Sequence, residues 1–168
     1  MNKTIRQHYL QLTDDNKALF EETEIVKKEI SEFYEQVKAF MTKMQNRYSG
    51  YQEINSASEK IPINLSEIEN NLIDTLTNYK IFAEGLVTFL ENGLAMNNKI
   101  AGYIHIIKEG GEKMVNNNLT NKHCEKILLR LQEGMQSLQN EFQQFKSRFA
   151  EKKSLLHQLS LLSDKLVN

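Results

Sequence analysis

The four histidines are the residues in this sequence best suited to hold a metal or to move a proton. They are His8, His105, His123 and His157. Helical bundles that bind two metals place a glutamate three residues before each ligating histidine. Here those four positions hold Ile, Gly, Thr and Ser, and no two histidines lie three or four residues apart. We therefore expect no metal site and four surface histidines, with partial burial only of His105, which stands among isoleucines.

The single cysteine does not form a catalytic pair with the histidine beside it. Cys124 follows His123 directly, and neighbours on a helix point about 100° apart. One cysteine allows neither an internal disulfide nor a cysteine-based zinc site. Glu21 and Glu22 stand among lysines on a solvated helix face, and no glycine-rich phosphate loop occurs. The sequence thus predicts no enzyme, with no catalytic, cofactor-binding or metal-binding residue and no small-molecule substrate.

The composition favours an all-α protein. The chain has 168 residues with only seven Gly and one Pro. A β-sandwich or barrel needs a tight turn every 8–12 residues, for which so few turn-forming residues do not suffice. The β-branched apolar runs that a parallel sheet requires are absent as well. What remains is a protein with few and long helices.

Heptad spacing is the strongest pattern in the sequence. Apolar residues alternate at spacings of three and four in three series, over residues 5–44, 65–114 and 124–166. The members that are not apolar are Asn16, Thr23, Thr75, Gly93, Gly110, Lys152 and Ser163. A sustained repeat of this kind indicates helices that pack along their length with a left-handed supercoil.

Two interruptions separate the three series. Pro62 cannot continue a helix interior, and Asn64 after it has the character of an N-cap, with Glu67 as its capping-box partner. An asparagine run at 116–118 marks the second interruption, and Thr120 is the next N-cap candidate. The predicted helices span about 3–57, 65–115 and 119–166.

Two boundaries stay open at this point. The first helix ends somewhere between Tyr48 and Glu59, with Ser49-Gly50 as an early alternative. Gly110 and the glycine after it predict a loosened end to the second helix.

Three helices of similar length predict a single domain over 1–168. Its expected form is an elongated antiparallel three-helix bundle, or coiled-coil rod. The second helix carries additional apolar residues beside its heptad series, which predicts contact on two sides and a central position. They are Ile73, Leu76, Val87, Leu90, Leu94, Ile104, and Ile106. Acidic residues of the first helix and basic residues of the third predict ion pairs between these two helices. The alternative is a four-helix bundle with a turn near Gly93–Asn98.

The predicted function is a non-enzymatic interaction, scaffold or assembly module. A bundle without catalytic residues offers length and surface, so we expect protein partners, self-association through helical faces, or both, as a subunit or adaptor of a larger complex. The net charge of −1 disfavours nucleic acid as a partner.

The alternative function is a membrane-active helical protein, either a pore-former or a membrane-associating module. Its basis is residues 81–107, which are glycine-rich, low in charge and apolar over a wide face. No stretch is long enough for a spanning helix. The first residues lack the apolar core of a Sec signal, so the expected location is cytoplasmic or exported without such a signal.

Overall fold

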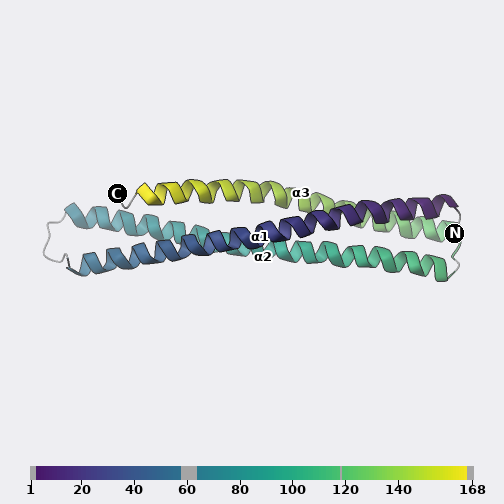
Figure 1. The fold of residues 1–168 in the computed structure, drawn as a ribbon, viewed down its shortest axis with the longest axis horizontal. Helices are drawn as coiled ribbons and strands as arrows, with labels where there is room; N and C mark the ends of the chain where they lie inside the picture. Colours follow the sequence, from purple (N-terminus) through teal and green to yellow (C-terminus); the bar gives the residue numbers. More distant parts are fainter. Residues whose placement is uncertain (1–2, 58–63, 118, 166–168) are drawn as a thin grey trace. The chain divides into compact units, whose positions relative to one another are not determined.

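The described residues form three long helices, whose arrangement is drawn in Figure 1. The computed structural model describes residues 3–57, 64–117 and 119–165, and the side chains of 51–70 are left out of the description. The helices are α1 (Lys3–Ala57), α2 (Asn64–Asn116) and α3 (Asn121–Lys165). The predicted all-α three-helix fold is therefore confirmed.

The chain divides into two compact units, each built from a stretch of all three helices. The first unit comprises Met1–Ile30 and Asn92–Arg148, and the second unit comprises Ser31–Glu91 and Phe149–Asn168. Each unit is thus a three-helix bundle.

Within the first unit, α1 and α2 run in opposite directions. The Tyr9 hydroxyl donates to the carbonyl of Ile107 at 3.1 Å, and the Asn97 amide donates to the carbonyl of Thr23 at 3.3 Å. Because the residue numbers on α2 fall as those of their contacts on α1 rise, these two helices are antiparallel.

Within the second unit, α1 and α3 run in the same direction. The rings of Phe33 and Phe149 meet edge to face with centroids 5.5 Å apart, and Lys43 pairs with Asp164 farther along both helices. The up-down-up order of an antiparallel three-helix bundle is therefore present (Figure 1).

The helix boundaries agree closely with the heptad pattern. The first helix reaches Ala57, so the early ending at Ser49 is wrong, and α2 is unbroken through Gly93, so the four-helix alternative is wrong as well. Thr120 lies just before α3, and its hydroxyl accepts the backbone N–H of His123 at 3.4 Å, as an N-cap does. Pro62 lies outside the described residues.

The predicted loosening at the end of α2 is wrong. The helix continues past Gly110 and Gly111 to Asn116. A Cβ at Gly111 would overlap the ring of Tyr9, so the missing side chain makes room for an aromatic ring packed against the helix. This contact, together with the hydroxyl bond from Tyr9 to the carbonyl of Ile107, offsets part of the cost of glycine within a helix.

Most of the apolar heptad residues form the core. Along α1 and α3 the buried positions follow the predicted series from Ile5 to Met44 and from Cys124 to Leu156. In α2 a second series is buried as well, which confirms contact on two sides. Its members are Leu76, Ala83, Leu90 and Asn97.

Among the side chains that the structure describes, four polar ones lie in the core, at Asn16, Thr23, Asn97 and Ser163. Thr23 and Ser163 donate to carbonyls of their own helices at 2.7 and 2.9 Å. The Oδ1 atoms of Asn16 and Asn97 accept no hydrogen bond from the described residues. An unsatisfied buried amide costs stability, and polar residues at such positions fix the register of packed helices.

Candidate interaction surfaces

The residues that suggested chemistry are dispersed over the two units. All four histidines are exposed, as expected for His8, His123 and His157. The partial burial predicted for His105 is wrong, because its side chain is 68% exposed and its Nε2 lies 3.0 Å from Glu109. The isoleucines nearby in sequence point around the helix in other directions, and one of them, Ile106, is itself 50% exposed.

The cysteine has a structural role. Cys124 is fully buried, in a cluster with Ile5 and Met114 at the start of α3. The neighbouring His123 is exposed, and its Nδ1 contacts the Thr120 hydroxyl at 2.9 Å. Over the described ranges, no group of three or more His, Cys, Asp or Glu side chains is placed to hold a metal ion.

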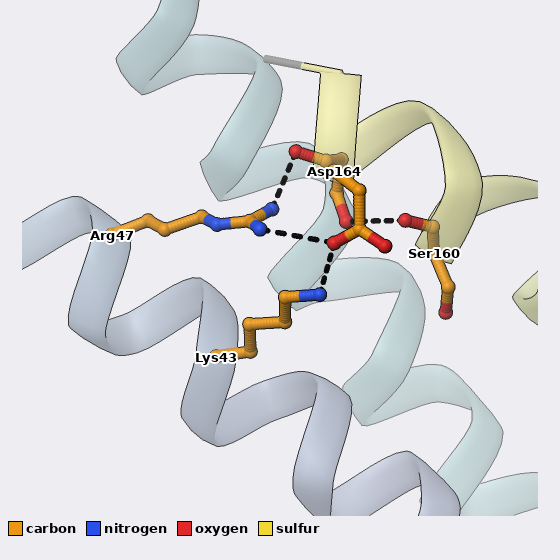
Figure 2. A network of polar contacts seen from close by, with 5 residues as sticks. Lys43, Arg47, Ser160 and Asp164 are labelled. Atoms are coloured by element: carbon orange, nitrogen blue, oxygen red, sulfur yellow. Dashed lines mark hydrogen bonds and ion pairs between the residues drawn. The ribbon is translucent and has the colours of Figure 1, made fainter. Parts of the chain in front are cut away.

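A network of polar contacts joins α1 and α3 in the second unit (Figure 2). Arg47 donates to the carbonyl of Ser163 at 2.5 Å and to the Asp164 carboxylate at 3.1 Å. Lys43 pairs with the same carboxylate oxygen, and the Ser163 hydroxyl donates to the carbonyl of Ser160. The cluster fixes the end of α3 against α1.

The two cations hold the pKa of Asp164 below its usual range, first through the hydrogen bond from Lys43 and then through that from Arg47. The charged carboxylate therefore stabilises the fold above its ordinary pKa of about 3.9, and this contribution is lost as the pH falls through the lowered value. We expect Asp164→Asn to melt at a lower temperature than wild type at neutral pH, and the difference to shrink on acidification.

Thermal melts from pH 7 down to strong acid measure this effect. Asp74→Asn is the matched control, because Asp74 is an exposed carboxylate on α2 that makes no ion pair within the described part of the chain. A gap between wild type and Asp164→Asn that stays constant at all pH values would contradict the assignment.

The predicted pairing of acidic α1 with basic α3 is present in the first unit. Lys146 of α3 pairs with Glu22 of α1, and both side chains are more than a third exposed. Lys99 of α2 also approaches Glu141 of α3 at 3.8 Å. Exposed pairs of this kind contribute about 0–1 kcal/mol each, so they orient the helices more than they stabilise them.

Two kinds of groove follow the helices of the first unit. Between α1 and α3, two hollows of about 510 and 360 Å³ are lined largely by amides and carboxylates. The amides include Gln132, Gln136, Gln139, Asn140 and Gln143. Between α1 and α2, a groove of about 390 Å³ has mainly apolar walls, and we call it the α1–α2 groove. Its lining residues are Thr13, Asn16, Lys17, Phe20, Ala101, Ile104, His105, Ile107 and Lys108.

Large apolar side chains are also exposed outside these grooves. They range from 42% exposed at Leu155 to 61% at Ile25 and occur on all three helices. The set is Leu10, Ile25, Ile81, Ile106, Val115, Leu129, Leu155, Leu161 and Leu162. Four of them, Leu129, Leu155, Leu161 and Leu162, lie on α3 outside its heptad series. The sequence does not predict their exposure, because the way in which neighbouring helices pack decides which side of a helix stays uncovered.

No protein-family model, curated protein or solved structure matches this chain. Within the described residues, none of the helices has a stretch both long and apolar enough to span a bilayer. The surfaces described above are therefore the basis for a functional assignment.

Proposed function

We propose that this protein is a non-enzymatic interaction and assembly module that binds other proteins, or further copies of itself, through its helical surfaces. The observation that carries the proposal is the set of nine large apolar side chains exposed on all three helices. Scattered single apolar residues are normal on a protein surface. A row of exposed apolar residues at regular helical spacing is a more specific sign of a protein-interaction surface.

Such a row lies on the last third of α3. Leu155, Leu159 and Leu162 have the spacing i, i+4, i+7, which places them on one face of the helix. Leu155 and Leu162 are 42% and 49% exposed, and Leu159 is half-buried. We call these three residues the α3 leucine row. A helix face of this kind is what a partner helix covers in a bundle or coiled coil.

Solution mass and affinity capture test the proposal. The wild-type chain is expected to exceed its 19.6 kDa monomer mass in light scattering, or to retain a partner at fixed stoichiometry from its native source. The double variant Leu155→Ser/Leu162→Ser should lose this association while its helicity is unchanged. The matched control is Ser154→Ala/Gln158→Ala, at two exposed positions of the same helix, which should associate as wild type does. A wild-type chain that is monomeric and retains nothing would overturn the proposal.

A second candidate function is membrane association through α2. Ile81 and Ile106 are 59% and 50% exposed near the two ends of the 81–107 segment. Gly85 and Gly102 face open space, with nothing within 4 Å of an added Cβ. Flotation with phosphatidylcholine and phosphatidylglycerol vesicles separates the two functions. Recovery of the chain with the vesicles, abolished by Ile81→Glu/Ile106→Glu, would favour the membrane function.

A further inference from the structure

We propose that the α1–α2 groove of the first unit binds an amphipathic helix of a partner protein whose apolar stripe is flanked by carboxylates. This inference rests on the proposed function and names the surface and the chemistry of the partner. It is independent of the α3 leucine row, which lies in the second unit.

The groove is large enough to receive side chains of a partner helix. Its volume of about 390 Å³ is far larger than the roughly 30 Å³ that one water occupies. Phe20 and Ile104 are half-buried, and Ile107 is buried, so the walls already present apolar surface. Side chains of a helix laid between two others fill hollows of this kind.

The apolar surface extends along the helix axis beyond the hollow itself. Leu10 lies at i−10 from Phe20 and at i−3 from Thr13, so it follows the same side of α1 as the lining residues of the groove, and its side chain is 51% exposed. Ten residues of helix correspond to about 15 Å. An elongated apolar surface flanked by separate cations suits two or three turns of a helix better than a compact polar ligand.

The charges along the groove select the partner. Lys17 stands on the α1 side and Lys108 on the α2 side, and no carboxylate lines the hollow. Neither ammonium group forms an ion pair within the part of the chain that the structure describes. Carboxylates placed on both flanks of an apolar stripe would pair with these two lysines, and such complementarity raises both the association rate and the specificity.

The neighbouring grooves do not offer this chemistry. The hollows between α1 and α3 include Asp15 and Glu22 among their lining residues. Glu22 is already paired with Lys146. An acid-flanked helix would therefore meet like charge there, which makes the α1–α2 groove the site of choice in the first unit.

Synthetic peptides test this proposal on the full chain. The probe is a fluorescently labelled helical peptide with leucines at i, i+4 and i+7 and glutamates on both flanks, and its comparison peptide carries lysines instead. We expect fluorescence anisotropy to show binding of the glutamate peptide, at least tenfold tighter than the lysine peptide and weakened by salt. Lys17→Glu/Lys108→Glu should reverse this preference.

Variants of the walls locate the binding. Ile104→Gln should weaken the glutamate peptide at least tenfold with unchanged helicity. Leu129→Gln is the matched control, because Leu129 is an exposed leucine on α3 of the same unit, 56% accessible, and it should bind as wild type does. If Ile104→Gln loses helicity, Ala101→Gln, at a half-buried wall position, takes its place.

The other occupants have distinct signatures, each of which would overturn the proposal. A doubled solution mass that Ile104→Gln returns to the monomer would assign the groove to a second copy. Vesicle binding that Ile104→Gln abolishes would assign it to lipid. Equal affinity for the two peptides would remove the role of Lys17 and Lys108. If the peptide fails to bind while the chain still associates through the α3 leucine row, the groove assignment fails and the proposed function stands.

Discussion

Replacing Phe142 with alanine is expected to lower the free energy of unfolding by about 3–5 kcal/mol. Phe142 is fully buried in the first unit and is the largest of the side chains with almost no exposure. Its removal loses the transfer free energy of the ring and leaves a cavity that three packed helices close only in part. Urea denaturation followed by circular dichroism measures the change.

Phe89→Ala is the comparison for this substitution. Phe89 belongs to the same kind of heptad series, but it is half-buried, and the Lys152 ammonium lies 5.8 Å from the centre of its ring. Its truncation should therefore cost clearly less than that of Phe142. An unfolding curve of Phe142→Ala that coincides with wild type would mean that the heptad residues do not form the core.

The second large effect is expected for Gly93→Pro, which should destabilise the protein by about 3 kcal/mol or more. Gly93 lies in the interior of α2 and is buried. Proline removes one backbone hydrogen bond and clashes with the preceding turn. In addition, side-chain atoms at this position would overlap the ring of Phe145 and come close to Ile30. A weaker helical signal in circular dichroism and a lower midpoint of the unfolding transition would report the effect.

Gly102→Ala is the control for Gly93. Gly102 lies in the same helix but is exposed and faces open space. Alanine there should raise the unfolding free energy by roughly 0.5–1 kcal/mol, because glycine is a poor residue for a helix interior. A helix that tolerates proline at 93 without loss of stability would contradict the continuity of α2.

The helices were predictable because the information that specifies them is local and repeated. A period of 3.5 residues over more than ten positions leaves one arrangement in which the apolar side chains are covered. Pro62 and the asparagines after Met114 separate the three series, so the observed bounds of α1 equal the predicted ones and those of α2 and α3 differ from them by one or two residues. The exposure of the histidines and the burial of Cys124 follow from the same register.

The details of α2 were harder to predict, because this helix contacts both neighbours. A residue beside its main series is buried or exposed according to which neighbour lies next to it. Leu76 and Leu90 are almost fully buried, whereas Ile106 is half exposed. The surroundings of its glycines likewise depend on tertiary packing. Gly111 packs against the ring of Tyr9, whereas nothing lies within 4 Å of a Cβ added at Gly102.

The α1–α2 groove could not be predicted from the sequence. Its walls come from residues 13–20 and 101–108, which the antiparallel pairing of α1 and α2 brings together. Lys17 and Lys108 are unremarkable as isolated surface lysines. Their position on opposite sides of one apolar hollow depends on the axial register of the two helices. The heptad pattern alone does not specify this register.

Each compact unit combines segments that are far apart in the chain, and this affects how the protein is made. Glu22 pairs with Lys146 and Lys43 pairs with Asp164, so more than a hundred residues separate the partners. Pairings of high sequence separation slow folding compared with helical proteins rich in local contacts. During translation neither unit can close before its own stretch of α3 has been made, which extends to Arg148 in the first unit and begins at Phe149 in the second. A proteolytic or genetic truncation that removes α3 would dismantle both units together.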